Sequence, residues 1–424
     1  MKVVIMAGGK GTRISSVASD IPKPMIKIDG KPVLEREIEC LREQGFTDII
    51  ITVSHLGSII MDYFGDGTKF GVNIEYFNET VPLGNAGALF QLKDKLTEDF
   101  LLLNADAIFD VDFRRFVAYH REKNARVTLF THPNNHPYDS GLIVADEQGC
   151  VEKWMTKEDD RNGWYKNRVN AGLHVISPEV LNQVITTPKI DLDRQLLKPL
   201  AGTGVMFAYD SPEYVKDMGT PERYEAVCRD YAAGHVKGNN LRNKQKAIFL
   251  DRDGTLNEYV GFLRKEEDFN LLPGVAEAIR KINASEYLAI LVTNQPVIAR
   301  GEVTGAQLNN IHNKMETLLG AEGAYLDAIY YCPHHPHKGY EGEIPALKID
   351  CDCRKPKPGM LLKAAEDYNV DLSSSWMIGD GENDIRAGIA AGCKTGLITT
   401  DKNAEFGQSI TDECLLALIN KILS

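Results

Sequence analysis

Short apolar runs alternate with helical patterns along most of this chain, and that alternation constrains the fold more than any other feature. The run Val3–Met6 is apolar, a helical pattern extends from Pro32 to about Gln44, and Ile49–Val53 is the next apolar run. Strands that are apolar on both faces are typical of parallel sheets covered by helices on both sides. We therefore expect an α/β chain with two doubly wound, mostly parallel sheets.

Two domains are expected because 424 residues exceed what one hydrophobic core usually organises. The stretch from 234 to 246 is polar, basic and rich in Gly and Asn, which is a linker composition. A new apolar run, Ala247–Leu250, begins just after it. The expected domains are residues 1–233 and 247–424.

The formal net charge of −12 argues against nucleic acid or an anionic membrane as the main partner. No apolar run reaches the roughly 20 residues that span a bilayer, and the first residues read as a strand, not as a signal peptide. The expected compartment is the cytoplasm. There, clustered cysteines among the eight indicate metal binding more than disulfides. A homo-oligomer is left open.

Several polar residues of the C-terminal half follow apolar runs. They are Asp251 and Asp253 after Ala247–Leu250, Thr293 and Asn294 after Leu288–Val292, Asp380 after Trp376–Ile378, and Lys355 in an Arg-Lys-Pro turn between them. In open parallel sheets, chemistry sits at the carboxyl ends of strands. Alone, the Asp-x-Asp-Gly-Thr segment could be an ordinary turn. With the later residues in order, it predicts a phosphate site that needs a hard divalent cation, Mg²⁺, to balance its carboxylates.

This set resembles the haloacid dehalogenase-like phosphatases across the whole C-terminal half. The resemblance implies that Asp251 is the nucleophile and Asp253 the general acid/base. Thr293 and Lys355 would hold the transferring phosphoryl group. Asp380 would bind Mg²⁺ together with Asp251 and the backbone carbonyl of Asp253.

Two tight pairs of metal-binding residues lie close together in this half. The pairs are Cys332 with His334 or His335, and Cys351 with Cys353. Three cysteines and one histidine at this spacing predict a structural zinc site, against free thiols beside a surface histidine. The site leads directly into Arg354 and Lys355.

The zinc loop and the segment Arg354-Lys355-Pro356 are similar to a subfamily of heptose-1,7-bisphosphate and histidinol-phosphate phosphatases. The family pattern favours His334 as the zinc ligand. The Ile298–Gly301 run resembles the heptose branch, although Pro296 and Val297 stand where Ser-Gly is usual. Arg300 and Arg354 would suit a substrate with a second, remote phosphate, although Arg300 could also be a surface arginine.

A glycine-rich loop follows the first strand, with Gly8, Gly9, Gly11 and Arg13. Glycines let backbone N–H groups approach an anion, but the spacing is neither a P-loop nor a dinucleotide fingerprint. Lys23 follows in a Pro-Lys-Pro-Met segment. Asp106 ends an apolar run and Asp217 precedes a Met-Gly-Thr-Pro segment. Asp106 alone could be a strand-end cap.

Together these motifs resemble the sugar-phosphate nucleotidylyltransferases through residue 224. The resemblance implies that Asp106 and Asp217 hold Mg²⁺, while Arg13 and Lys23 neutralise the triphosphate. The remaining positions would line the base, sugar and sugar-phosphate sites: Gly84, Gly87, Lys157, Asn170 and Gly172. Asn85 stands where Thr is common, and Thr156 replaces a Glu beside Lys157. The chemistry needs positioning and charge neutralisation, without a covalent intermediate.

The N-terminal half most resembles the D-glycero-α-D-manno-heptose-1-phosphate guanylyltransferases. A phosphatase that leaves a heptose 1-phosphate would supply their substrate, so the two resemblances together imply GDP-heptose synthesis from heptose bisphosphate and nucleoside triphosphate. Three alternatives stay open. They are a nucleotidyltransferase for another sugar 1-phosphate, a histidinol-phosphate phosphatase half, and a non-catalytic sugar-nucleotide sensor.

Overall fold

The computed structural model describes residues 1–8, 20–183 and 189–424. The chain divides into two compact units. The first comprises Met1–His132, Gly141–Thr156 and Val169–Asn240, and the second Pro133–Ser140, Lys157–Arg168 and Leu241–Ser424. No helix in the described ranges is long and apolar enough to cross a membrane.

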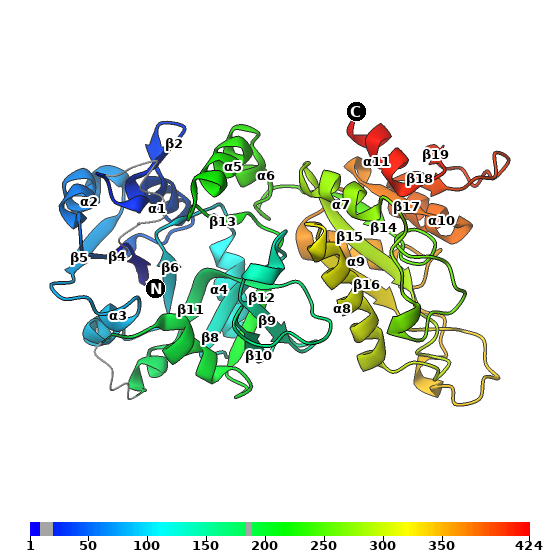
Figure 1. Ribbon diagram of the computed structural model, residues 1–424, viewed down its shortest axis with the longest axis horizontal. Coiled ribbons are helices and arrows are strands. Elements are labelled where there is room, and N and C mark those ends of the chain that lie inside the picture. Colours follow the sequence, from blue (N-terminus) through cyan, green and yellow to red (C-terminus); the bar gives the residue numbers. More distant parts are fainter. Residues whose placement is uncertain (9–19, 184–188) are drawn as a thin grey trace. The chain divides into compact units, whose positions relative to one another are not determined.

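A nine-stranded sheet forms the first unit, in the order β10-β9-β11-β6-β1-β4-β5, with β8 beside β11 and β12 beside β8 (Figure 1). Its strands are β1 (Val3–Met6), β4 (Asp48–Val53), β5 (Asn73–Asn78), β6 (Phe100–Asn104), β8 (Val127–His132), β9 (Leu142–Ala145), β10 (Val151–Met155), β11 (Val169–Ile176) and β12 (Met206–Asp210). The four strands β6-β1-β4-β5 are parallel, whereas β11 runs antiparallel to β6, β8 and β9. The expected parallel sheet is therefore present within a mixed one.

Helices cover both faces of this sheet because its central strands are apolar on both faces. Val3 and Ile5 belong to one buried cluster and Val4 to another, as the two-residue period of a strand requires. The helices are α1 (Val33–Glu43), α2 (Gly57–Phe64), α3 (Gly87–Gln91), α4 (Phe113–Glu122), α5 (Pro221–Ala232) and α6 (His235–Gly238). Helices α1, α2 and α4 pack into the first cluster, and α3 into the second.

Shorter elements complete the first unit. Two small antiparallel sheets of two strands pair β2 (Lys27–Ile28) with β3 (Lys31–Pro32) and β7 (Ala107–Phe109) with β13 (Val215–Asp217). Single turns of 3₁₀ helix and one π-helix, Leu192–Leu197, lie in the connections. Helix α6 falls within the segment expected to be a linker, and the division between the units lies between Asn240 and Leu241.

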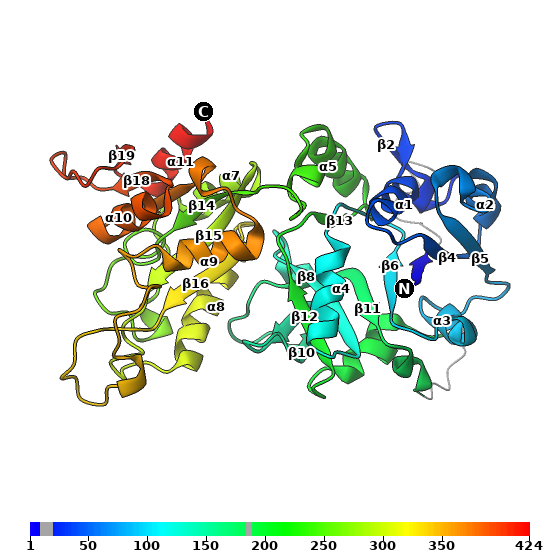
Figure 2. The same ribbon diagram turned by 180° about the vertical axis from the view of Figure 1, so that it is seen from behind.

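The second unit is built on a six-stranded, wholly parallel sheet in the order β16-β15-β14-β17-β18-β19 (Figure 2). Its strands are β14 (Lys246–Leu250), β15 (Tyr287–Asn294), β16 (Ala328–Cys332), β17 (Trp376–Gly379), β18 (Lys394–Ile398) and β19 (Ile410–Asp412). Its helices are α7 (Val275–Asn283), α8 (Gly305–Ala321), α9 (Gly359–Tyr368), α10 (Glu382–Ala391) and α11 (Leu415–Leu423).

Strand β14 lies at the centre of this sheet, with β15 on one side and β17 on the other. The chain leaves β14 for β15 and β16 and later returns to the opposite side, so the strand order reverses at β14. Helices α7, α8 and α11 pack on one face, and α9 and α10 on the other. A reversal of this kind opens a crevice at the carboxyl ends of the strands, where open α/β sheets bind ligands.

Candidate active sites

Three of the predicted phosphatase residues meet at the carboxyl edge of the second sheet. Asp251 directly follows β14, Thr293 lies at the end of β15, and Asp380 directly follows β17. The Asp251 backbone N–H donates to the Ile378 carbonyl at 2.9 Å, which ties the loop after β14 to β17. The strand ends therefore bring together residues that are far apart in sequence.

Lys355 is the buried centre of this group. Its Nζ lies 2.6 Å from Asp251 Oδ1 and 2.5 Å from Asp384 Oδ1, and it donates to the Val292 carbonyl at 2.8 Å. Burial alone would lower the pKa of Lys355, but Asp251 and Asp384 outweigh it and raise the pKa, so the ammonium stays charged. Asp384, on α10, is the second carboxylate that anchors this lysine.

Asn294 holds the backbone of Lys355. The Lys355 N–H donates to Asn294 Oδ1, and Asn294 Nδ2 donates to the Lys355 carbonyl, both at 3.0 Å. This reciprocal pair fixes the turn that carries the lysine. The expectation that Asn294 binds substrate stays a prediction, and its side chain also holds the Lys355 backbone.

Three carboxylates can place one oxygen each within 4.8 Å of one another: Asp251, Asp380 and Asp384. Burial, with help from the charges of Asp384 and Asp253 and against Lys355, raises the pKa of Asp251 to about 6. The side chain of Asp380 reaches solvent, yet the protein around it and the charge of Asp251 raise its pKa to about 6. Carboxylates that repel one another in this way suit a divalent cation with oxygen ligands.

Gly254 allows the acidic cluster to form. Its φ is +85°, and a Cβ at this position would lie 2.0 Å from Asp380 Oδ2. Any side chain would therefore displace the carboxylate. Asp253, the predicted acid/base, is not one of the three clustered carboxylates and pairs with Arg252, at 2.9 Å between Nη2 and Oδ2. Neither Arg252 nor its partner Gln295 was singled out from the sequence.

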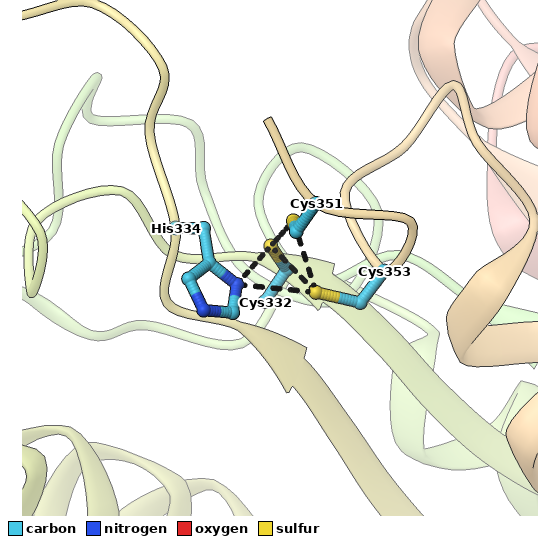
Figure 3. Close-up of side chains that lie close together, drawn as sticks. All are labelled: Cys332, His334, Cys351 and Cys353. Atoms are coloured by element: carbon cyan, nitrogen blue, oxygen red, sulfur yellow. Dashed lines mark hydrogen bonds between the residues drawn. The ribbon is translucent and has the colours of Figure 1, made fainter. Parts of the chain in front are cut away.

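The predicted zinc ligands form one compact cluster, shown in Figure 3. The three sulfur atoms lie 3.1–3.5 Å apart, and His334 Nδ1 lies 3.3 Å from the Cys353 sulfur and 3.7 Å from that of Cys332. These separations exceed a disulfide bond and can surround one tetrahedral ion. His335 lies outside the cluster, with Nδ1 3.2 Å from the His337 carbonyl.

The two arginines predicted to bind a remote phosphate are both held by neighbours. Arg354 donates to the His334 carbonyl at 3.2 Å. The Arg300 guanidinium lies between two rings, 4.1 Å from the centroid of Phe262 and 4.3 Å from that of Tyr340. Its Nε is 2.7 Å from Glu302. Stacking and ion pairing leave the outer nitrogens of such a guanidinium suited to bind an anion.

In the first unit, the predicted phosphate loop is described only at its start. Gly8 follows β1 and its carbonyl accepts from Ser54 Oγ at 2.6 Å, while Gly9, Gly11 and Arg13 lie outside the described residues. Lys23 Nζ lies 2.5 Å from Asp106 Oδ2, beyond the end of β6. One predicted cation and one predicted metal ligand are thus paired directly.

Asp217 lies opposite Ala107 in the small β7–β13 sheet, and Ala107 follows Asp106 in the chain. Burial would raise the pKa of Asp217, but Arg223, the Gly219 N–H and Lys23 hold it below its usual value. Arg223 Nη1 lies 2.7 Å from its Oδ2. Each of the two predicted metal ligands is therefore paired with a cation, Asp106 with Lys23 and Asp217 with Arg223.

The predicted sugar-pocket residues lie on β11, beside the end of β6. Asn170 Oδ1 accepts from the Gly172 N–H and faces His174 Nε2, both at 3.2 Å. Burial lowers the pKa of His174 to about 4, so the ring is neutral. A Cβ on Gly172 would lie 2.4 Å from Asn104 Nδ2. With Oδ1 engaged, Asn170 is left to offer its NH₂ group as a donor.

Local packing accounts for the two other predicted glycines of this half. Gly84 has a φ of +82°, and a Cβ there would lie 2.3 Å from the Ile190 carbonyl oxygen. A Cβ on Gly87 would lie 2.6 Å from the Leu83 Cβ. Lys157 begins the segment Lys157–Arg168, which groups with the second unit. Both glycines are therefore required by packing, whatever they bind.

Comparison with known proteins gives matches to both halves. The nucleotidyl transferase family matches residues 2–233, and the HAD-hydrolase-like family matches residues 352–409. A D-glycero-beta-D-manno-heptose-1,7-bisphosphate 7-phosphatase of Pasteurella multocida is 46% identical over 159 residues, covering 37% of this chain and 84% of that protein. A probable mannose-1-phosphate guanylyltransferase of rice is 30% identical over 267 residues, covering 58% of this chain and 73% of that protein.

Solved structures are also similar to the C-terminal half. One of them is a D,D-heptose 1,7-bisphosphate phosphatase from B. bronchiseptica complexed with magnesium and phosphate. It is 34% identical, with a TM-score of 0.37, and the match covers 42% of this chain and 98% of that one.

Proposed function

The chain belongs to the nucleotidyl transferase family, its C-terminal half belongs to the family of the heptose bisphosphate 7-phosphatases, and on that premise we propose a bifunctional enzyme of GDP-heptose synthesis. The phosphatase domain, residues 247–424, removes the 7-phosphate of D-glycero-α-D-manno-heptose 1,7-bisphosphate. The transferase domain, residues 1–233, joins GMP from GTP to the resulting heptose 1-phosphate and releases pyrophosphate.

The phosphatase reaction follows from the arrangement around Asp251. An oxygen of Asp251 attacks the phosphorus, the bond from phosphorus to the sugar oxygen breaks, and the carboxyl proton of Asp253 passes to that oxygen. A water oxygen then attacks the phosphorus and gives its proton to Asp253. Inorganic phosphate leaves and the Asp251 carboxylate is restored.

Lys355 and Thr293 support both steps. The Lys355 ammonium, 2.6 Å from Asp251, balances negative charge that builds on the phosphoryl oxygens. Thr293 is 1% exposed at the end of β15, where its hydroxyl can hold one of those oxygens. Asp251, Asp380 and the Asp253 carbonyl would hold Mg²⁺, which when bound neutralises charge between nucleophile and phosphate. The repulsion among the carboxylates fits that ion.

The remote end of the substrate would meet Arg300 and Arg354. Both guanidinium groups are fixed by neighbours, so little side-chain freedom is lost when they bind an anion. A sugar with phosphates at both ends would use them at the phosphate that is not removed. The Cys332, His334, Cys351 and Cys353 cluster would hold Zn²⁺ as a structural ion and fix the loop that carries Arg354.

In the transferase reaction, an oxygen of the sugar 1-phosphate attacks the α-phosphorus of GTP, and the bond to the β-phosphate oxygen breaks. Lys23 and Arg13 would neutralise the triphosphate. Asp106 and Asp217 would hold Mg²⁺, and Asn170 would donate to a sugar oxygen. The pairing of Lys23 with Asp106 supports this assignment, because it puts a cation beside a metal-binding carboxylate.

The observation that carries the proposal is the buried group of Asp251, Lys355 and Asp384 at the point where the strand order reverses. The test is incubation of the chain with each anomer of heptose 1,7-bisphosphate and with GTP, ATP, CTP or dTTP in turn. We expect GDP-heptose from the α-anomer with GTP, with release of both phosphate and pyrophosphate. Phosphate release that survives Asp251→Asn would refute the phosphatase mechanism.

A second candidate is a transferase half that uses mannose 1-phosphate. The rice relative, named as a probable mannose-1-phosphate guanylyltransferase, supports this reading. Comparison of kcat/KM for heptose 1-phosphate, mannose 1-phosphate and glucose 1-phosphate with GTP separates the two. Phosphate release from histidinol phosphate, measured in parallel, tests whether the C-terminal half is a histidinol-phosphate phosphatase.

A further inference from the structure

Arg252 is a fully buried cation bonded to the proposed acid/base, Asp253, and it has no role in the proposed phosphatase reaction. Its side chain is 0% exposed. Its Nη2 donates to Asp253 Oδ2 at 2.9 Å and Oδ1 at 3.0 Å, and its Nε donates to Oδ1 at 3.2 Å. These three hydrogen bonds hold the two side chains in place relative to each other.

Two further side chains fix the guanidinium itself. Nη2 donates to Gln295 Oε1 at 3.1 Å, and Nη1 lies 3.3 Å from His312 Nε2. His312 is on α8 and 5% exposed, and burial together with Arg252 holds its pKa well below the usual value. The ring is therefore neutral, and its Nε2 can accept from the guanidinium.

Gln295 extends this network to the catalytic edge of the sheet. Its Nε2 donates to Asp253 Oδ2 at 3.0 Å and to Thr293 Oγ1 at 2.9 Å. Asn257 Nδ2 adds a bond to Asp253 Oδ1 at 3.1 Å. Both carboxylate oxygens of Asp253 are thus held on their inner side, while 17% of the side chain stays exposed.

We propose that Arg252, Gln295 and His312 are positioning residues that aim Asp253 at the leaving oxygen of the phosphate ester. None of the three needs to touch the substrate. The inference rests on the proposed phosphatase function and adds a specific consequence to it. Loss of the network should slow proton transfer to the leaving group and spare the attack by Asp251.

Leaving-group dependence distinguishes this role from a merely structural one. A sugar alkoxide needs the proton of Asp253, whereas p-nitrophenolate leaves without one. The test compares kcat/KM, which reports steps up to formation of the phosphoenzyme, for heptose 1,7-bisphosphate and p-nitrophenyl phosphate. For Arg252→Lys we expect a loss of roughly 10- to 100-fold on the sugar phosphate and a change within about threefold on the aryl phosphate.

His312 provides a second test that leaves the loop after β14 unaltered. His312→Leu removes the acceptor for Arg252 and should show the same selective loss. His312→Gln keeps an acceptor and should restore most of the sugar phosphatase rate. Arg280→Lys is the matched control, since that arginine is in the same unit with 41% of its side chain exposed; both rates should be unchanged.

The outcomes separate this inference from the function on which it rests. If the unmodified chain releases no phosphate from the sugar bisphosphate, the proposed function fails. If the unmodified chain does release phosphate, the variants decide the positioning role. That role is wrong if Arg252→Lys and His312→Leu lower the rates on the sugar phosphate and on p-nitrophenyl phosphate equally, or lower neither rate. Circular dichroism and zinc content of each variant show whether an equal loss comes from unfolding.

Discussion

Lys355 is a single side chain on which three parts of the phosphatase site depend. It pairs with Asp251 after β14, with Asp384 on α10, and with the Val292 carbonyl on β15. It is 3% exposed, so its partners have little water to replace it. Removal of the charge should therefore affect stability as well as catalysis.

We predict that Lys355→Met abolishes phosphate release and lowers the free energy of unfolding by about 3–5 kcal/mol, because two buried carboxylates lose their counter-charge. Urea unfolding and phosphate release measure the two effects. Lys357→Met is the control, because Lys357 is 39% exposed and pairs with the exposed Asp350. A Lys355→Met variant as stable as its parent would contradict the buried ion-pair network.

The raised pKa of Asp251, about 6, predicts a pH dependence of the Mg²⁺ effect. In the metal-free protein, this carboxyl stabilises the fold below its ordinary pKa of 3.8, and that contribution is lost as the pH rises through 6. Mg²⁺ requires the ionised form. Added Mg²⁺ should thus raise Tm more at pH 7 than at pH 5, as measured by thermal unfolding.

Asp251→Asn is the control for that prediction. The variant lacks one of the two carboxyls with a pKa raised to about 6, and one proposed ligand, while Asp380 remains. Its Mg²⁺ shift of Tm should therefore be smaller, and the difference between the two pH values should narrow. An equal Mg²⁺ shift of Tm at both pH values in the unmodified chain would show that the ion does not compete with protons at Asp251.

At the scale of residues, whether the sequence could predict a site residue depends on where that residue lies relative to a strand. Asp251 and Thr293 lie at strand ends, and parallel pairing necessarily brings such ends together. Arg252 and His312 are 60 positions apart and meet only because α8 packs beside the loop after β14. A lone His within a helix carries no sign of that partner, so the network behind Asp253 could not be foreseen.

The turn after β14 is an element whose backbone path is set by one glycine. We predict that Gly254→Ala lowers phosphatase activity by about tenfold or more and weakens Mg²⁺ binding, since the new Cβ would displace Asp380. Gly261→Ala is a close control: its φ is also positive, +77°, and nothing lies within 4 Å of its Cβ position. Mg²⁺ titration of activity compares them.

The outcome for the two glycine variants separates backbone strain from the clash. Both substitutions place an alanine at positive φ, which is unfavourable by a similar amount. If both variants lose activity to the same extent, conformational strain explains the effect and Asp380 is not displaced. A loss confined to Gly254→Ala supports the carboxylate site.

The loop between β16 and α9 is predicted to depend on metal. Cys353→Ser should abolish zinc binding and reduce phosphate release, because Lys355 follows two residues later, and should leave pyrophosphate release by the other half unchanged. Zinc content by atomic absorption and the two product assays measure this. Cys414→Ser, an exposed cysteine outside the cluster, should change none of the three.

Among elements, the helices and strands with strong apolar patterns were predicted closely. The helix expected from Pro32 to Gln44 is α1 at Val33–Glu43, and the run Ile49–Val53 lies within β4. The antiparallel strand β11, which carries Asn170 and Gly172, was not foreseen as such. Its direction follows from pairing with β6 and β8, which lie far from it in the chain. Local patterns do not encode strand direction.

At the scale of the whole molecule, the metal-binding carboxylates proposed for the two reactions lie in separate compact units, Asp106 and Asp217 in the first and Asp251 and Asp380 in the second. We predict that heptose 1-phosphate is released into solution between the two steps. Asp251→Asn keeps only the transferase site, and Asp106→Asn keeps only the phosphatase site. An equimolar mixture of the two should then make GDP-heptose at the same steady rate as the unmodified chain, when both samples contain the same number of working sites of each kind. Coupled assays of both products follow the lag and the final rate.

Direct transfer of the intermediate within one chain would give a different result. The mixed variants would then form GDP-heptose much more slowly than the unmodified chain at the same concentration. The difference would grow on dilution, since the intermediate would have to find a second molecule.

With Zn²⁺ bound, the Cys332, His334, Cys351 and Cys353 cluster would join both ends of the loop between them. The stretch between those ends can therefore differ in length and sequence without moving Lys355, which the cluster and Asn294 hold from outside it. Substitutions, insertions and deletions in this stretch could change which sugar phosphates bind, while the positions of the reacting groups stay the same. Engineers could graft the corresponding loop of another phosphatase by the same route.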